Sequence, residues 1–365
     1  MTESGGNNVT SSGTAAPNNP KGRAIYAVEI ATLDSAGTPS FVNSGWKVWG
    51  YTNSTNMTFS IPSETLALDT NFDGYVDRLY VGDTGGSMWR VDMSSTSTAA
   101  WTVNRIFSAD PGADATNGRK IFYKTSAIIE QFMVSGQIVP QVTVFFGTGD
   151  REHPLNTAVV DRFYSVIDKQ QTTANNISEG NLMDVTLDQL QTTTTQSGPG
   201  SVADILSHLN AATNYGWYIK FNQNSGEKML APPVVLNGVV YFTTFAPGAS
   251  VVTDPCQPGN LGVGRMYAVD YKTGEAVLNY DTINDSQYST LHNATTGNAR
   301  ATAMTGQVLQ RSDRLQTIGN SIPSGVVLVV SASGETALFV GSGGAMPKQK
   351  PKKGGAIVQE YWRQR

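Results

Sequence analysis

Residues 78–92 read Arg78-Leu-Tyr-Val-Gly82-Asp-Thr-Gly-Gly86-Ser-Met-Trp89-Arg-Val-Asp92, two apolar runs joined by a turn of small residues. The pattern predicts an antiparallel pair of strands over Arg78–Gly82 and Ser87–Asp92. The end of this unit, an aromatic residue followed by apolar positions and an acid, recurs along the chain. The copies are Tyr26-Ala-Val-Glu29, Trp89-Arg-Val-Asp92, Tyr164-Ser-Val-Ile-Asp168 and Tyr267-Ala-Val-Asp270. A repeated strand unit of this kind is typical of β-propeller blades, each of which is a small antiparallel sheet.

Further strand candidates are separated by clusters of Gly, Asn, Asp and Pro. They cover Ala24–Ile30, Val142–Gly147, Phe163–Ile167, Gly238–Phe245, Arg265–Asp270, Val326–Ser331 and Ala337–Gly341. Charged residues make up only 15% of the 365 residues, against roughly 25% in an average soluble domain. Short strands and turns are therefore favoured over long charged helices. We predict an all-β fold, a complete or partial β-propeller with degenerate blades and one short helical insertion, with a β-sandwich as the alternative.

The helical spacing is confined to one segment. Ser201 and Asp204 form a Ser-x-x-Asp capping box, and apolar residues at 202, 205, 206 and 209 then fall on one helical face. This helix lies in a polar insertion near residues 170–215. We therefore predict a flexible segment over residues 1–20 and a propeller domain over residues 21–365. A final strand-like run, Ala356–Trp362, is expected to close the fold.

Charge, hydropathy and cysteine content limit the classes of function. The chain has 29 Asp and Glu against 25 Lys and Arg, a net charge of -4, which excludes a polybasic nucleic-acid scaffold. No stretch approaches the roughly 20 apolar residues of a membrane-spanning helix. The single cysteine, Cys256, is expected to be a buried structural thiol. The N-terminus lacks a signal-peptide pattern, so we expect a cytoplasmic protein or a piece of a longer exported one, and the motifs below favour the second.

The residues Asp69-Thr-Asn71-Phe-Asp73-Gly74-Tyr75-Val-Asp77 form the chemical constellation that stands out. Oxygen-bearing side chains fall at positions one, three, five and nine of a loop with glycine at six, as in an EF-hand calcium loop. Ca²⁺ takes six to eight oxygen ligands, and alternate residues of a curled loop point inward. The predicted metal ligands are Asp69, Asn71, Asp73, the backbone carbonyl of Tyr75, and Asp77, which must supply the closing carboxylate.

Two other interpretations of this loop remain open. Carboxylates packed this closely repel one another unless a cation neutralises them, but a turn rich in Asp, Asn and Gly also forms by bonding to its own backbone. Mg²⁺ is a poorer candidate than Ca²⁺, because it prefers octahedral sites that retain water. Ca²⁺ is therefore the predicted cofactor.

The segment from Asp69 to Asp92 resembles the calcium-loop blade of PilY-type type IV pilus proteins. The resemblance continues at Phe145-Phe-Gly-Thr-Gly149, at Val239-Val-Tyr-Phe-Thr-Thr-Phe245, at Cys256-Gln-Pro-Gly and at Gly264-Arg-Met-Tyr-Ala-Val-Asp-Tyr-Lys-Thr-Gly274. It implies the C-terminal propeller of a non-enzymatic pilus-tip adhesin and assembly factor, in which calcium tunes extension against retraction. It also implies an extracellular location at the pilus tip or outer cell surface, minor pilins of the tip complex as partners, and abiotic or host surfaces as adhesion targets.

Other functions give weaker patterns. Tyr267-Ala-Val-Asp270-Tyr-Lys-Thr273-Gly274 also resembles the repeat of quinoprotein dehydrogenase propellers, although the tryptophan expected after Gly274 is absent. A periplasmic quinoprotein-like oxidoreductase is therefore one alternative, and a propeller with purely structural calcium is another. Asp150, Glu152 and His153 are close in sequence, but neighbouring residues of an exposed turn are expected to point apart.

Overall fold

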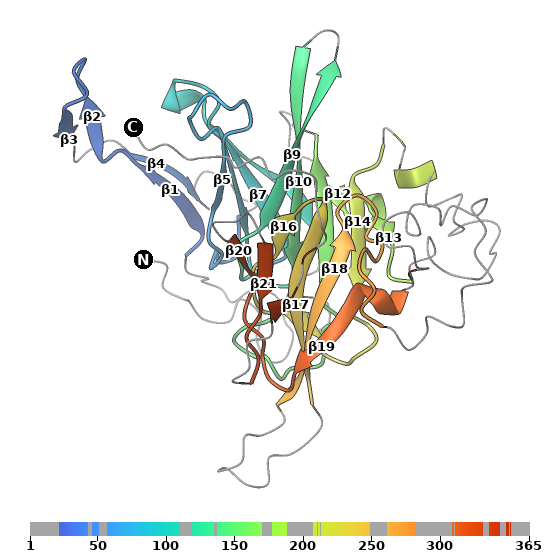
Figure 1. Ribbon diagram of the computed structural model, residues 1–365. Helices are drawn as coiled ribbons and strands as arrows, with labels where there is room; N and C mark the ends of the chain where they lie inside the picture. Colours follow the sequence, from blue (N-terminus) through green and yellow to red (C-terminus); the bar gives the residue numbers. More distant parts are fainter. Residues whose placement is uncertain are drawn as a thin grey trace.

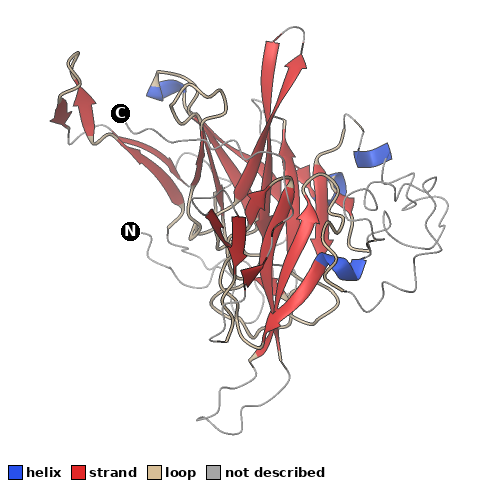
Figure 2. Cartoon of the chain, in the orientation of Figure 1, coloured by secondary structure: helices blue, strands red, loops and turns tan. Residues whose placement is uncertain are grey.

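The computed structural model describes residues 22–42, 46–50, 57–109, 118–134, 137–169, 177–187, 207–209, 211, 213–248, 261–281, 309, 311–330, 336–343, 348–349 and 351. Strands dominate this part of the chain, and the helical segments are short (Figure 2). The prediction of an all-β fold is confirmed. Within these residues, no helix has both the length and the hydropathy of a segment that crosses a membrane.

The described strands form five β-sheets that follow one another in chain order and one further two-stranded hairpin (Figure 1). The first sheet pairs β1 (Ala24–Val28) with β4 (Trp46–Gly50), and a separate hairpin of β2 (Ala31–Leu33) and β3 (Pro39–Phe41) lies between them in sequence. The second sheet contains β5 (Leu66–Leu68), β6 (Arg78–Gly82), β7 (Ser87–Asp92) and β8 (Thr102–Ser108), with β12 (Ile177–Ser178) added parallel to β8.

The third sheet contains β9 (Ser126–Val134), β10 (Gln137–Gly147), β11 (Arg162–Asp168) and β14 (Gly216–Lys220), with β13 (Met183–Asp184) added parallel to β14. The fourth sheet contains β15 (Lys228–Met229), β16 (Val234–Leu236), β17 (Val239–Pro247), β18 (Gly262–Asp270) and β19 (Leu315–Gly319). The fifth sheet contains β20 (Val327–Val330), β21 (Thr336–Phe339) and β22 (Lys348–Gln349). The second, third and fourth sheets thus each contain a four-stranded antiparallel meander.

The hydrophobic core is divided into layers between successive sheets. Ile25 and Trp49 of the first sheet pack with Trp89 of the second. Separate clusters join the second sheet to the third, the third to the fourth, and the fourth to the fifth. Among the described residues, no core cluster joins the fifth sheet back to the first, so a closed ring of blades is not seen there.

Two glycines permit tight packing at the ends of β6 and β10, the first against the segment before β9 and the second against β15. A Cβ on Gly82, at the end of β6, would lie 2.2 Å from Cγ2 of Ile121. A Cβ on Gly147, at the end of β10, would lie 2.5 Å from Sδ of Met229. Because real Cβ atoms do not approach this closely, the Gly-rich turns identified in the sequence are sites of tight packing.

The connection between β11 and β14 joins two sheets. Its described part, residues 177–187, contains β12, the short helix η2 (Glu179–Asn181) and β13. Strand β12 pairs with the second sheet and β13 with the third. The carboxylate of Glu179 forms ion pairs with Arg119, at an N–O distance of 3.0 Å, and with Arg162 of β11, at 2.7 Å. The polar insertion therefore supplies strands and an ion-pair network to the second and third sheets.

Strands β6 and β7 cover Arg78–Gly82 and Ser87–Asp92, so the two strands predicted from the central motif are confirmed. Helical structure is present at residues 207–209, and two further short helices are η1 (Thr98–Ala100) and η6 (Arg311–Arg314). Several sequence predictions lie outside the described residues. They concern residues 1–20, the capping box of Ser201 and Asp204, Cys256, and Ala356–Trp362.

Candidate metal-binding loop

The loop Asp69–Asp77 connects β5 to β6 in the second sheet. Its ends are held together because Leu68 and Arg78 are paired across the two strands. The backbone N–H of Asp77 donates to the carbonyl of Leu68 at 3.0 Å, and the carbonyl of Asp77 accepts from Met93 at 2.8 Å. The loop is therefore anchored at its base to two neighbouring strands, while residues 71–76 are exposed.

Three of the predicted ligands converge inside the loop. The N–H of Asp73 donates to Oδ1 of Asp69 at 3.2 Å and to Oδ1 of Asn71 at 3.0 Å, which places two predicted ligand oxygens on one donor. The amide of Asn71 donates in turn to Oδ2 of Asp73 at 3.0 Å. The N–H of Gly74 donates to Oδ2 of Asp69 at 2.7 Å, and that of Tyr75 to Oδ1 of Asp73 at 2.9 Å.

Two residues with positive φ produce this curled backbone. Gly74, at position six, has φ +92°, and an added Cβ would meet nothing within 4 Å. Glycine is therefore needed here for the backbone conformation, and not because a larger side chain would clash. Phe72 has φ 61°, which is unusual for a bulky residue and costs conformational energy. Phe72, Tyr75 and Val76 all have exposed side chains at the tip of the loop.

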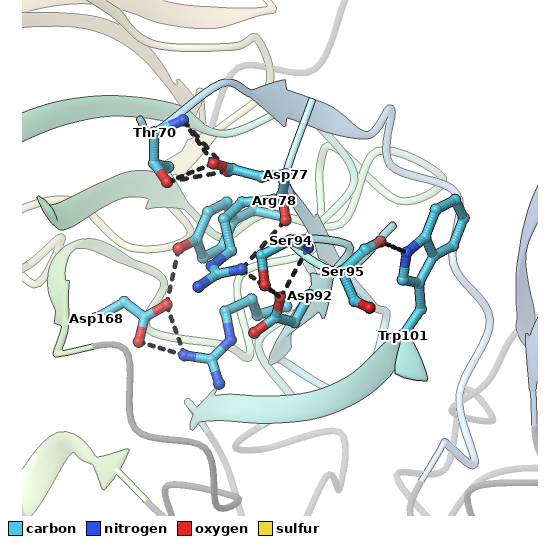
Figure 3. A network of polar contacts seen from close by, with 10 residues as sticks. Thr70, Asp77, Arg78, Asp92, Ser94, Ser95, Trp101 and Asp168 are labelled. Carbon is cyan, nitrogen blue, oxygen red and sulfur yellow. Dashed lines mark hydrogen bonds and ion pairs between the residues drawn. The ribbon is translucent and has the colours of Figure 1, made fainter. Parts of the chain in front are cut away.

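The other two predicted ligands lie differently. The buried carboxylate of Asp77 faces Thr70, and accepts from the Thr70 N–H at 3.2 Å and from its hydroxyl at 2.8 Å (Figure 3). The side chain of Tyr75 is exposed, as expected of a residue predicted to act through its carbonyl. The structure thus brings Asp69, Asn71 and Asp73 together, and it directs Asp77 to the base of the loop.

Thr70 is the residue that the sequence analysis missed. The sequence analysis gave position two of the loop no role, but the hydroxyl and N–H of Thr70 both bond to the carboxylate of Asp77 at position nine. The signal that was available is the residue type, because threonine both donates from its hydroxyl and tolerates extended backbone.

A buried polar network supports the loop from below (Figure 3). Arg78, the first residue of β6, pairs with Asp92 at the end of β7. Burial raises the pKa of Asp92, but hydrogen bonds from Ser94 and the charge of Arg78 outweigh it, and the pKa lies below its usual value. Asp168 accepts from Arg90 at 2.8 Å and from the Tyr80 hydroxyl at 2.7 Å, which ties the second sheet to the third.

A second acidic group lies on the third sheet. Ligand atoms of Asp150, Glu152 and His153 lie within 4.8 Å of one another, so the expectation that these side chains point apart is wrong. The reason is that Asp150 accepts from both Lys120, at 2.7 Å, and His153, at 3.1 Å. Within the described ranges, the carboxylates of the Asp69–Asp77 loop do not form such a group, because Asp77 is turned toward Thr70.

A cavity of about 800 Å³ lies between the third and fourth sheets. Its wall includes cationic Lys220 and Arg314 and anionic Glu227. Glu227 accepts from the hydroxyls of Thr244, at 2.7 Å, and Tyr267, at 2.9 Å, while Arg314 donates to the carbonyl of Val185 at 2.8 Å. The Arg314 bond joins the fourth sheet to the segment that follows β13, whereas the Glu227 bonds lie within the fourth sheet.

Comparison with known proteins places the chain near one family. No protein-family model matches it. The type IV pilus biogenesis factor PilY1 homolog of Xylella fastidiosa is 23% identical over 232 residues, which cover 61% of this chain and 15% of that protein. The chain is similar to a PilY-type protein. The crystal structure of the Pseudomonas aeruginosa PilY1 C-terminal domain also matches, with a TM-score of 0.49 and 18% identity over 78% of this chain and 60% of that one.

The match to the PilY1 homolog confirms the resemblance to PilY-type proteins noted in the sequence. The chain spans only 15% of the length of the curated PilY1 homolog.

Proposed function

We propose that this chain is a calcium-binding, non-enzymatic β-propeller of a PilY-type protein at the tip of a type IV pilus or on the outer cell surface. There it supports pilus assembly, in the balance of extension against retraction, and adhesion to surfaces. Its partners are the minor pilins of the tip complex. The relationship to a protein named as a pilus biogenesis factor supports the pilus role, and the Asp69–Asp77 loop supports calcium binding.

The observation that carries the calcium proposal is the convergence of Asp69, Asn71 and Asp73 in an exposed, anchored loop. Two carboxylates and an amide oxygen there are held only by backbone N–H groups of the loop and by one amide N–H. Oxygen is the ligand atom that Ca²⁺ prefers, and a divalent cation offsets the repulsion between the two carboxylates far better than an N–H does. The exposure of residues 71–76 leaves the loop open to an ion from solvent.

The proposed regulation depends on the anchoring of the loop. Calcium supplies positive charge at the ligands, and the base of the loop links these ligands to the rest of the second sheet. Asp77 holds Thr70 and, through its carbonyl, the end of β7. The exposed side chains of Phe72, Tyr75 and Val76 form the tip whose position depends on the loop. A ligand that orders the loop therefore shifts the population of the tip conformation that a pilin can recognise.

The propeller proposal is supported by the order of the sheets. Three consecutive four-stranded meanders stack face to face, and each buries apolar residues against the next. Radial stacking of such meanders is the architecture of propeller blades. A crystal structure of the protein tests this directly, because a sandwich would place the sheets in two layers and not in an arc.

Calcium titration of chelator-treated protein by isothermal calorimetry tests the site. We expect one site, with a dissociation constant between about 10⁻⁶ and 10⁻³ M, and loss of binding in Asp73→Ala. Asp34→Ala is the matched control, because Asp34 also accepts two backbone N–H bonds in an exposed turn, from Ala36 at 2.9 Å and Thr38 at 2.8 Å. Absence of binding in folded wild-type protein, or equal binding by Asp73→Ala, contradicts the proposal.

The pilus role is tested in the bacterium that encodes the chain. Asp73→Ala is expected to change the number of surface pili and twitching motility, while Asp34→Ala at the same protein level is not. Unchanged piliation together with lost calcium binding would leave calcium a purely structural role. Purified protein that carries a quinone and reduces an electron-accepting dye would contradict the non-enzymatic assignment.

A further inference from the structure

The cavity between the third and fourth sheets has an exposed rim and a buried floor. Its volume of about 800 Å³ lies within the range of pockets that hold a small molecule. Strand β14 and the segment after it supply one side of the wall, and the short helix η6 with β19 supplies the other. Gln223 and Thr317 of the wall are exposed, whereas Phe221 and Tyr267 are buried.

Cationic side chains outnumber anionic ones in this wall. The charged residues are Lys220, Arg311 and Arg314 against Glu227 and Asp281. Two of them form ion pairs with residues outside the wall, Lys220 with Asp184 at 2.8 Å and Glu227 with Arg265 at 3.6 Å. Counting these two partners leaves the balance unchanged, at one excess positive charge. Charges in a partly enclosed cavity are screened less than charges on an open surface, so the excess favours an anionic ligand.

Arg311 is the cation that these pairs leave over. In the part of the chain that the structure describes, it has no acidic partner. Its guanidinium faces the side-chain amide of Gln223, whose oxygen, when turned toward it, accepts from Nε at 2.9 Å. A neutral amide does not neutralise a guanidinium. The planar donors of Arg311 therefore suit a carboxylate, which an arginine binds through two parallel hydrogen bonds.

Arg314 adds a second positive charge on the same side of η6. Residues three apart eclipse each other in a 3₁₀-helix, so Arg311 and Arg314 share one face. Arg314 is buried and donates to the carbonyl of Val185 at 2.8 Å. This bond holds η6 against the segment that follows β13, and thereby fixes the backbone that carries Arg311 at the cavity.

The neutral polar groups of the wall suit the hydroxyl groups of a ligand. They include the side chains of Gln223, Ser312, Gln316 and Thr317, and amides and hydroxyls both donate and accept hydrogen bonds. The Tyr280 hydroxyl and the Gln316 amide nitrogen lie near each other without the geometry of a hydrogen bond, and neither has another partner among the described residues. Buried donors without acceptors are costly. Both residues line the cavity, so an oxygen-bearing ligand brings acceptors to them.

We propose that this cavity binds a sugar acid, with its carboxylate on Arg311 and its hydroxyl groups on the neutral amide and hydroxyl side chains. The single excess charge matches a carboxylate better than a phosphate monoester, which carries about −1.5 to −2. The neutral groups favour a polyhydroxylated ligand over a simple carboxylate. The proposal depends neither on calcium nor on the pilus role, since no residue of the wall belongs to the Asp69–Asp77 loop.

Isothermal calorimetry with galacturonate tests the proposal. The wild-type chain is expected to bind it with a dissociation constant of about 1 mM or below. Galactose has the same ring with a hydroxymethyl group in place of the carboxylate, and should bind at least about tenfold more weakly. Trigalacturonate identifies the source of the ligand. Binding of the trimer at least as tight as that of the monomer supports a unit within a polysaccharide, and binding of the monomer alone supports a free sugar acid.

Variants of Arg311 separate this site from general attraction of anions. Arg311→Gln should weaken galacturonate binding at least about tenfold, and Arg311→Lys, which keeps the charge but loses the planar donors, should fall between it and wild type. Arg151→Gln is the matched control, because Arg151 is an exposed arginine outside the wall, over the ring of Tyr123 at 5.5 Å. Unchanged melting temperatures show that a variant is folded.

Four results overturn the proposal. They are no binding of about 10 mM galacturonate by folded wild-type protein, equal affinity for galactose, equal weakening by Arg151→Gln, and inorganic phosphate that displaces galacturonate and binds more tightly. If Arg311→Gln fails to fold, Arg311→Lys decides the question, and unchanged galacturonate affinity in the folded lysine variant then overturns the assignment of the carboxylate to Arg311.

Discussion

Two connections in the second sheet contain the same residue types but have different roles. The loop Asp69–Asp77 and the turn Gly82–Gly86 both combine Asp, Thr and Gly, and they lie on either side of β6. In the turn, Asp83 is fully buried and accepts from Gly85 at 2.9 Å, Ser87 at 2.8 Å and Trp89 at 2.8 Å. In the loop, the acceptor oxygens of Asp69, Asn71 and Asp73 lie together, and residues 71–76 are exposed to solvent.

The difference shows how burial decides the role of a carboxylate. Asp83 has a complete set of protein donors and is closed off from solvent, so it stabilises the turn and its link to Ile121 in the following segment. Asp69 and Asp73 accept from N–H groups of their own loop, and residues 71–76 of this loop are exposed, which leaves the two carboxylates open to a cation from solvent.

The largest expected effect is that of Asp83→Ala. It leaves two buried N–H groups and the indole of Trp89 without their acceptor, at a cost of about 3 kcal/mol or more in the free energy of unfolding. Urea denaturation of the metal-free protein measures this loss. Asp73→Ala serves as the comparison and should cost less than about 1 kcal/mol without calcium, since its partners are exposed. Equal losses in the two variants would remove the distinction.

The second prediction concerns pH. Burial raises the pKa of Asp83 from 3.8 to about 6. A carboxyl with a raised pKa in the folded state contributes stability that is present below about pH 4 and is lost as pH rises through about 6. The free energy of unfolding of wild type relative to Asp83→Asn should therefore fall by about 2–3 kcal/mol between pH 4 and pH 7.

Thermal unfolding of both proteins across this pH range measures that difference. Asp161, whose pKa burial also raises to about 6, is present in both proteins and cancels. A difference that is constant with pH would mean that Asp83 does not stay buried in the folded state.

The third prediction compares glycines. Gly82→Ala places a Cβ 2.2 Å from Ile121 and should cost about 2 kcal/mol through overpacking. Gly74→Ala meets no atom within 4 Å but must keep φ +92°, at a cost of about 1 kcal/mol. Only Gly74→Ala should also weaken calcium binding. The two variants are compared by denaturation and by calcium titration, and a loss of binding in Gly82→Ala alone would contradict the assignment.

The smallest expected effect is that of Phe72→Asn. Asparagine adopts positive φ more readily than phenylalanine, so the substitution should stabilise the metal-free loop by a few tenths of a kcal/mol. Calcium affinity should stay within about threefold, because Phe72 supplies no ligand. Reduced pilin binding with unchanged calcium affinity would identify the exposed Phe72 ring as part of the recognition surface.

Much of the fold followed from short sequence patterns, and the exceptions have a physical cause. Strands β7 and β18 carry apolar runs ending in an acid, and the runs specify strands wherever both faces are covered. Strands β12 and β13, of two residues each, exist because sheets distant in sequence pair with them. Such pairing leaves no local pattern, so these strands were not predicted.

The candidate site shows the same limit. The spacing of Asp69, Asn71 and Asp73 follows from the period of a curled loop, and the three side chains converge, while their role as metal ligands stays a prediction. The orientation of Asp77 depends on Thr70 and on burial under the loop. A motif defines which residues are near one another, but competition between donors decides where a carboxylate points.

The segment of residues 177–187 has a mechanical consequence. It pairs with β8 through β12 and with β14 through β13, and Glu179 lies between the two pairings. A pulling force applied along the chain cannot extend the third sheet without also breaking contacts of the second. Together they span residues 66–220, which corresponds to roughly 50 nm of extended chain. The two sheets should therefore yield to load as one unit, and the length released would be a single large step.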